Sequence, residues 1–404
     1  MGLMIGNGMA EAKMSALLKG ALGGTAGDPM ALGMRAVHRA VSDLRRGTPV
    51  LLDGGSECLV LAAAETVGAR GLSDLSGAAI GPAVLLLSAP RAAALLARPV
   101  AATLSSPLAA EDAPVSLRLS PALLSAESLR RLADPVAEQL LPETPQIVPS
   151  VGFVQALSPA AIALAKIGRL LPALVAAPAS AAAGARLGLL TVSVADVLAY
   201  PLSAAASLTR VAEAHVPLED APEARIVAFR AADGGIEHLA ILVGRPEVAG
   251  AAAPLCRIHS ECFTGDLLGS LRCDCGPQLR GAIARMAAEE CGGVLLYLAQ
   301  EGRGIGLVNK LRAYTLQDTG LDTLDANRAI GYGADERDFR VAATMLEALG
   351  IPRVRVLTNN PDKLAGLAAC GIGVEGRVSH LFAANGVNDG YLATKKARFG
   401  HLMG

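Results

Sequence analysis

Apolar and polar positions first form a regular pattern near residue 35. Residues 35–47 place apolar side chains at helical spacing and end at Gly47, and residues 49–53 follow as a short apolar run that leads into a turn. Residues 1–30 are rich in Met, Gly and Ala and show no helical period. We therefore expect a flexible N-terminal extension over residues 1–30, followed by an α/β unit.

A second regular region begins at residue 224. Residues 224–244 predict two strands joined by a turn at Asp233, Gly234 and Gly235, which is a strong hairpin signal. Farther along, the expected helices are 277–290, 307–318 and 337–349, and the expected strands are 293–298 and 353–357. This alternation predicts an α/β or α+β fold. We place one domain at residues 31–210 and a second at residues 211–404.

Composition and charge exclude several classes of function. The chain has 404 residues, of which 52% are hydrophobic, and this is enough for two packed domains. A net charge of -1 gives no general attraction to nucleic acid or to an anionic membrane, so neither is an expected partner. The longest apolar stretches, 78–97 and 160–183, are interrupted by prolines and charges, and the first residues do not form a secretory signal. We expect a cytoplasmic protein.

Three of the seven cysteines lie close together in the sequence, at Cys262, Cys273 and Cys275. In a reducing compartment this clustering indicates metal binding or catalysis before disulfides. Three thiolates leave one tetrahedral position open, as in catalytic zinc sites, where the metal lowers the pKa of water from about 15.7 to about 7. The alternative is that Cys273 and Cys275 are ordinary small residues on a turn, because their spacing is not that of a zinc finger.

Two segments are candidates for binding phosphate. Residues 300–306 read QEGRGIG between a strand and a helix, so glycine amides and Arg303 could approach a phosphate closely. Farther on, Asn360 is the expected N-cap of a helix, with Pro361 at its first position and Lys363 in its first turn. Each pattern has an ordinary alternative, which is a glycine turn for the first and a capped helix with a solvated lysine for the second.

Taken in order, six segments of the second half resemble GTP cyclohydrolase II. They are RIHSEC, RCDCG with Gln278, QEGRGIGL, NKLRAY with LQD, ADERDF, and LTNNP with its lysine. The resemblance covers about 211–404 and implies one zinc ion on Cys262, Cys273 and Cys275, with magnesium accompanying the triphosphate of GTP. It also implies a homodimer. The reaction it implies converts GTP to 2,5-diamino-6-ribosylamino-pyrimidinone phosphate, formate and diphosphate, at the start of riboflavin synthesis.

The same resemblance assigns roles to single residues. It implies that GTP is contacted by Arg257, Ile258, His259, Ser260, Glu261, Gln278, Glu301, Gly302, Arg303, Thr323, Thr358 and Lys363. It makes Asp335 the proton acceptor, Tyr314 an active-site hydroxyl and Arg337 the residue described in that family as the nucleophile. Because a guanidinium with a pKa above about 12 is a poor nucleophile, stabilising charge on the α-phosphate is the physically easier role for Arg337.

The first half resembles, more faintly, dihydroxybutanone phosphate synthase, in AVSDLRRGTPVLL, LVLAAAE, LAKIGRLLPALV and LLTVSVADVLAY. The acidic loop of that family is reduced here to Asp53 and Glu57. Its His-Thr-Glu stretch is replaced by Leu157, Ser158 and Pro159. We therefore expect residues 31–210 to be catalytically inactive and kept for folding, dimerisation or regulation.

Three other functions stay open at this point. The first is a bifunctional enzyme with residual synthase activity, and the second is a regulator that binds GTP without turnover. The third is a related cyclohydrolase that releases a different product from GTP. Ala299, which stands where the family commonly has arginine before QEG, leaves the third alternative open.

Overall fold

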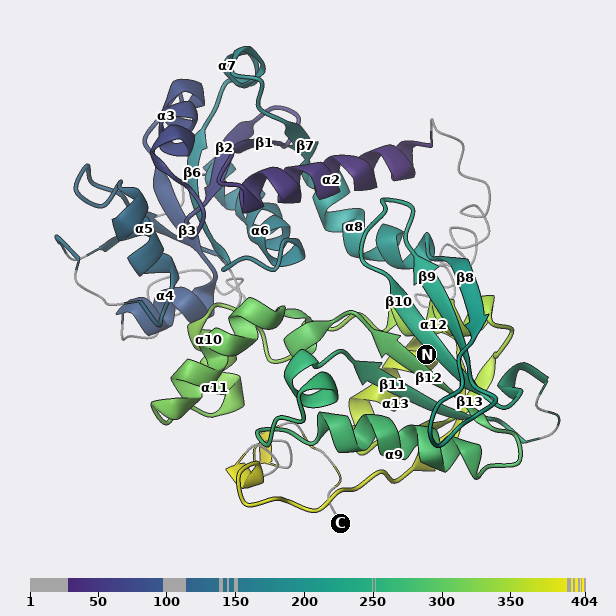
Figure 1. Ribbon diagram of the computed structural model, residues 1–404. Coiled ribbons are helices and arrows are strands. Elements are labelled where there is room, and N and C mark those ends of the chain that lie inside the picture. The colour runs from purple at the N-terminus through teal and green to yellow at the C-terminus, as the bar shows by residue number, and fades with distance from the viewer. Residues whose placement is uncertain are drawn as a thin grey trace, which may run out of the picture.

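The chain forms two seven-stranded sheets with helices packed around each of them (Figure 1). This computed structural model describes residues 28–96, 114–137, 141–143, 145–148, 152–248, 250, 252–390, 394, 397, 398, 400 and 402. The expected α/β class is confirmed. Of the expected extension over residues 1–30, residues 1–27 lie outside the described part of the chain.

The first sheet has the strand order β5-β4-β3-β6-β2-β1-β7 and is antiparallel except where β1 pairs with β7. Its strands are β1 (Val50–Asp53), β2 (Cys58–Ala63), β3 (Val84–Leu87), β4 (Val115–Arg118), β5 (Gln146–Val148), β6 (Ala173–Pro178) and β7 (Thr191–Ser193). Its helices are α2 (Pro29–Arg45), α3 (Ala69–Ala78), α4 (Ala89–Leu96), α5 (Ala126–Ala133), α6 (Gly152–Ile167), α7 (Ala181–Arg186) and α8 (Val194–Ala206). Alternate side chains of β1 point to opposite faces of the sheet, because Leu51 packs in one hydrophobic cluster and Val50 and Leu52 pack in another.

The second sheet has the order β14-β13-β11-β12-β10-β9-β8. Its strands are β8 (Thr209–His215), β9 (Arg225–Arg230), β10 (His238–Val243), β11 (Leu255–Ser260), β12 (Gly293–Leu298), β13 (Arg353–Leu357) and β14 (Gly373–Val378). Its helices are α9 (Cys275–Ala287), α10 (Leu307–Asp318), α11 (Thr323–Ala329), α12 (Arg340–Ala348) and α13 (Pro361–Ala369). Because β12, β11, β13 and β14 run parallel, their carboxyl ends meet at one edge, where open α/β sheets commonly bind ligands.

Most predicted elements of the second half are confirmed near their expected bounds. The hairpin forms between β9 and β10, and α10, β12 and β13 coincide with the expected ranges. Helix α12 begins at Arg340 instead of residue 337, because Asp338 accepts a hydrogen bond from the backbone N–H of Arg340 at 2.9 Å and forms a turn there. In the first half, α2 begins at Pro29 instead of near residue 35, because the side chain of Asp28 caps it.

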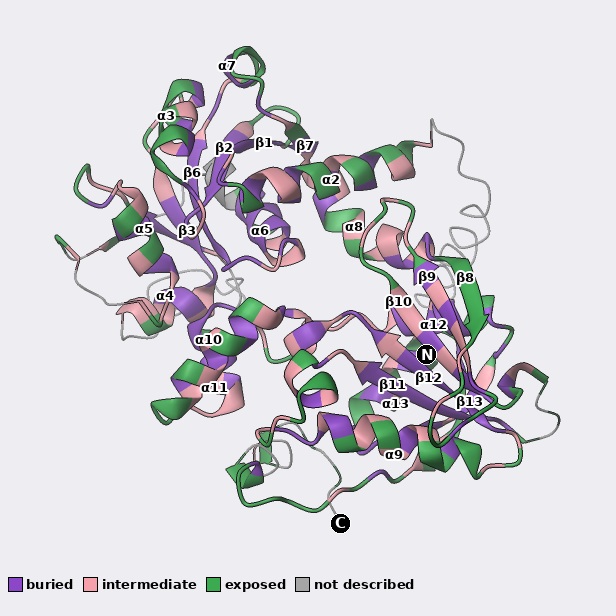
Figure 2. Cartoon of the chain, viewed as in Figure 1, coloured by how far each residue is buried: buried purple, intermediate pink, exposed green. Residues whose placement is uncertain are grey.

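One of the hydrophobic clusters extends across both halves of the chain. Buried side chains of α10 and α11, including Ala313, Leu316 and Ala326, belong to the same cluster as the core of the first sheet. In Figure 1 these two helices lie beside α4 and apart from the second sheet. Figure 2 shows buried residues concentrated on the inner strands of both sheets, whereas β8 is exposed. Helix α10 therefore depends on the first half for its packing.

We found no helix in the described ranges that is long and apolar enough to span a bilayer.

Candidate active site

A pocket opens at the carboxyl ends of β11, β12 and β13. Of the residues singled out from the sequence, it is lined by Arg257, His259, Ser260, Glu261, Cys262, Cys273, Cys275, Gln278, Glu301, Gly302, Arg303, Tyr314, Thr323, Arg337, Thr358 and Lys363. Two predicted residues lie outside the lining. The side chain of Ile258 is fully buried in the core of the sheet, so it can face a ligand only through its backbone, and Asp335 is paired with Arg337.

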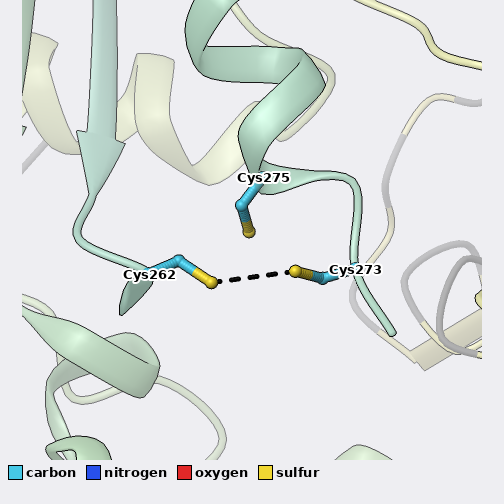
Figure 3. Close-up of side chains that lie close together, drawn as sticks. All are labelled: Cys262, Cys273 and Cys275. Carbon is cyan, nitrogen blue, oxygen red and sulfur yellow. Dashed lines mark hydrogen bonds between the residues drawn. The ribbon is translucent and has the colours of Figure 1, made fainter. Parts of the chain in front are cut away.

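The three predicted thiols come together at one place in this pocket (Figure 3). Cys262 follows β11, Cys273 lies on the next loop and Cys275 opens α9. Their sulfur atoms lie within 4.8 Å of one another, and the Sγ atoms of Cys262 and Cys273 are 3.7 Å apart. Bonds of about 2.3 Å at tetrahedral angles would place two zinc-bound sulfurs about 3.8 Å apart. The spacing therefore fits a shared metal ion.

A glycine makes room for this cluster. A Cβ atom at Gly265 would lie 2.7 Å from Sγ of Cys273 and 2.9 Å from Sγ of Cys262, which is closer than real contacts allow. Among the described residues, the three cysteines form the one group of three or more His, Cys, Asp or Glu side chains close enough to share an ion. The donor set, its burial and its spacing are those of a soft-metal site.

Lys310 brings a positive charge to the cluster and was not singled out from the sequence. Its Nζ atom donates to Sγ of Cys262 at 3.0 Å, to Oγ1 of Thr264 at 3.0 Å and to Oε1 of Glu301 at 2.9 Å. Hydrogen bonds from Cys273 and Cys275, together with this ammonium, lower the pKa of Cys262 and favour its thiolate. The spacing of Lys310 and Tyr314, four residues apart on α10, was the available signal that both face one site.

His259 is held by a pair that sequence reasoning also missed, Asp266 and Tyr297. Nε2 of His259 lies 3.1 Å from Oδ1 of Asp266, and Oδ2 of Asp266 accepts from Tyr297 Oη at 3.0 Å and from the backbone N–H of Cys262 at 2.9 Å. Burial lowers the pKa of His259 and favours the neutral ring. Its Nδ1 atom is buried and has no hydrogen-bond partner in the described part of the chain. Asp266 thus fixes both the imidazole and the backbone of one thiol.

Two further buried polar atoms on β11 lack partners among the described residues, Nε of Arg257 and Oγ of Ser260. The rest of the Arg257 guanidinium is bound, because Nη1 donates to the carbonyl of Leu357 at 2.9 Å and Nη2 donates to Gln278. Burial lowers the pKa of Arg257 to about 10. Unpartnered buried polar atoms are costly, so their concentration in one pocket indicates a polar ligand that satisfies them.

The glycine loop places its backbone close to the ligand space. Gly302 and Arg303 both have φ of 63°, a left-handed conformation that costs a residue other than glycine about 1–3 kcal/mol. A Cβ atom at Gly304 would lie 2.8 Å from the carbonyl oxygen of Glu336, so only glycine fits there. Glu301 holds the loop by accepting from the backbone N–H of Phe263 at 2.7 Å. The strained Arg303 is therefore directed into the pocket by a closely packed loop.

Asp335 and Arg337 form one unit at the edge of the pocket. Nε of Arg337 donates to Oδ1 of Asp335 at 2.8 Å. Burial opposes ionisation, but the guanidinium outweighs it and holds the pKa of Asp335 below its usual value. On the neighbouring helix Asn360 caps α13, as predicted, and Lys363 donates from Nζ to the carbonyl of Ile258 at 2.6 Å. Several cations thus face one pocket that also holds the thiols.

Comparisons with known proteins identify the family of the chain. The sequence model of the family GTP cyclohydrolase II matches residues 209–379. GTP cyclohydrolase-2 of Azospirillum brasilense is 48% identical over 385 residues, covering 92% of this chain and 94% of that protein. GTP cyclohydrolase-2 of Xylella fastidiosa (strain Temecula1) is 38% identical over 90% of this chain and 86% of its own length.

A solved structure is similar at a lower level. It is a two-domain 3,4-dihydroxy-2-butanone 4-phosphate synthase from A. baumannii, 16% identical, with a TM-score of 0.32 over 86% of this chain and 99% of that chain. The two cyclohydrolase relatives, by contrast, extend over both halves of the chain at high identity. The chain therefore belongs to the GTP cyclohydrolase II family, and it is a hydrolase of riboflavin biosynthesis.

Proposed function

We propose that the protein is a zinc-dependent GTP cyclohydrolase II that releases 2,5-diamino-6-ribosylamino-pyrimidinone phosphate, formate and diphosphate from GTP. The observation that carries the proposal is the pocket in which three thiols spaced for a metal lie together with Arg303, Arg337 and unpartnered polar atoms of β11. A bound zinc ion would activate water for attack on carbon 8 of the purine. We propose Cys262, Cys273 and Cys275 as its ligands.

The remaining residues bind the nucleotide and move protons. We assign the base and ribose to the segment from Arg257 to Glu261 and to Gln278. Arg257, His259 and Ser260 carry the unpartnered polar atoms that need a polar ligand. Gln278 accepts a hydrogen bond from Arg257 and lines the same pocket. Ile258 takes part through its backbone. The triphosphate, with its magnesium, is assigned to Arg303 and Lys363, supported by Glu301, Gly302, Thr323 and Thr358.

The acid-base chemistry is assigned to Asp335 and Tyr314. Asp335 is kept ionised by Arg337, so it is ready to accept a proton. Tyr314 lines the pocket near Lys310, whose Nζ lies 5.7 Å from its ring centroid, and its hydroxyl can donate to the opening ring. Arg337 is already a cation in an ion pair, and we assign it to stabilising negative charge at the α-phosphate.

We further propose a cytoplasmic homodimer in which residues 31–210 are inactive and residues 211–404 carry catalysis. In the first half Asp53 accepts a hydrogen bond from the backbone N–H of Gly55 at 2.8 Å and serves a turn, while Glu57 is exposed. These two acids give little basis for a synthase site. Turnover of ribulose 5-phosphate by the purified chain would instead establish a bifunctional enzyme.

The proposed function is tested by incubating the purified protein with GTP and identifying the products by mass spectrometry. We expect the pyrimidinone phosphate, with formate and diphosphate in equal amounts. Bound but unchanged GTP would identify a regulator. A product that retains carbon 8 as a formyl group would identify a related cyclohydrolase that stops earlier.

A further inference from the structure

Arg169, a residue of the first half of the chain, contacts the segment that carries the glycine loop of the active site. It follows α6 and donates a hydrogen bond from Nη2 to the carbonyl of Ala299, which immediately precedes the loop 300–306. Its own carbonyl accepts from Nδ2 of Asn309 at 3.0 Å, just after the loop. Arg169 therefore contacts the chain on both sides of the loop.

The backbone at Arg169 is strained. Its φ is 54°, and among the described residues the only other non-glycine residue with a positive φ is Arg303, inside the loop itself. The side chain also packs on Gly306, where a Cβ atom would lie 3.0 Å from Cδ of Arg169. Backbone strain persists only where surrounding contacts enforce it, so Arg169 and Arg303 are each held by closely packed neighbours.

Neighbouring residues hold the other side of the loop in the same way. Nζ of Lys166 donates to Oε1 of Glu336 at 2.6 Å. The backbone N–H of Glu336 donates to the carbonyl of Arg303 at 3.1 Å, and Asp335 and Arg337 flank it in the sequence. The segment around Arg169 thus contacts the loop at Ala299 and, through Glu336, at Arg303.

The position of the Arg169 guanidinium disfavours its positive charge. Arg169 is partly buried, and burial lowers its pKa, while the carboxylates of Glu261 and Glu301 act in the opposite direction. Both carboxylates line the active-site pocket. A buried cation rarely stabilises a fold more than apolar packing of the same volume would. This favours a role for Arg169 in fixing a specific geometry.

We propose that Arg169 is a positioning residue for GTP turnover, through which the first half holds the loop 300–306 in its working conformation. The inference rests on the proposed function, because it names what the loop does during turnover. It also gives the first half a task that needs no active site of its own. The loop conformation, and with it the position of Arg303, depends on a residue 130 positions away from Ala299.

The test uses full-length R169A and R169K, with D134N as the matched control. Asp134 pairs with Nε of Arg312 at 2.9 Å across the same junction between the halves. We expect R169A to bind zinc like wild type, to lose about tenfold in kcat with a smaller change in KM, and to exchange the amide hydrogens of residues 299–310 faster. R169K, which keeps a donor, should recover part of both, and D134N should match wild type in both.

Wild-type kcat and unchanged exchange of residues 299–310 in R169A would overturn the proposal. If R169A fails to fold, R169K provides the test. Amide exchange and kcat of R169K identical to those of wild type would then count against a role for the guanidinium. The exchange measurement needs no turnover. Faster exchange in R169A with no GTP chemistry in wild type would therefore refute the proposed function alone.

Discussion

Replacing Lys310 by methionine should weaken metal binding without removing a ligand. Three thiolates and one divalent ion carry a net charge of -1, and the ammonium 3.0 Å from Sγ of Cys262 balances it. Loss of such a supporting partner typically costs about 10–100-fold in metal affinity, which is about 1.4–2.7 kcal/mol. Folding stability should fall as well, by about 3 kcal/mol, because Glu301 loses a buried partner but keeps two backbone donors.

The assay is an equilibrium competition for zinc between the protein and a chromophoric chelator, with folding checked by circular dichroism. K166M is the matched control, since Lys166 also pairs with a carboxylate, Glu336, but touches no sulfur. We expect K310M to bind zinc at least tenfold more weakly than wild type and K166M to bind it equally well. Zinc affinity of folded K310M within twofold of wild type would refute the charge-balance reasoning.

Three other variants test separate parts of the site. Cys273→Ser should lose both zinc and formate production, because two thiolates hold the ion poorly; a metal-free, active variant in elemental analysis would contradict this. Arg337→Ala should suppress diphosphate release, while Arg337→Lys keeps partial release if charge alone matters; equal loss in both would indicate a specific guanidinium role. Burial, and to a smaller extent the positive charge of Arg169, lowers the pKa of His238 to about 4. The neutral ring therefore contributes to folding stability above pH about 6.5, and this contribution is lost as the pH falls toward 4. In His238→Asn the side-chain amide can still accept the hydrogen bond from the backbone N–H of Ala299. Between pH 7 and pH 5 the free energy of unfolding in urea should therefore fall by about 1–2 kcal/mol less in this variant than in wild type. An equal fall in both proteins would show that His238 is not responsible.

The elements of the second half were predictable where the hydrophobic period is strong and its ends carry clear signals. Helix α13 has Asn360 and Pro361 at its start, and the sequence placed it correctly. Helix α9 begins at Cys275 without a capping side chain, so its start could not be predicted from a cap. In the first half, the cap at Asp28 lay inside a region whose composition indicates an extension, and the start of α2 was therefore misplaced.

The site was predictable only as far as its residues stand in recognisable motifs. Asp266 and Tyr297 are separated by 31 positions, and each looks ordinary in its own segment. Their shared contact with His259 depends on β11 and β12 lying side by side, which no local period encodes. Arg169 was even less predictable from the sequence, because it contacts the segment of the glycine loop only when the two halves of the chain pack together.

In the proposed mechanism, removal of carbon 8 of GTP requires zinc on Cys262, Cys273 and Cys275. The most direct measurement is to strip the metal from the protein, restore zinc in steps, and follow formate released from GTP labelled at carbon 8. Formate release should rise in proportion to bound zinc and level off at one zinc per chain. Formate release by the stripped protein at the full rate, independent of added zinc, would contradict the mechanism.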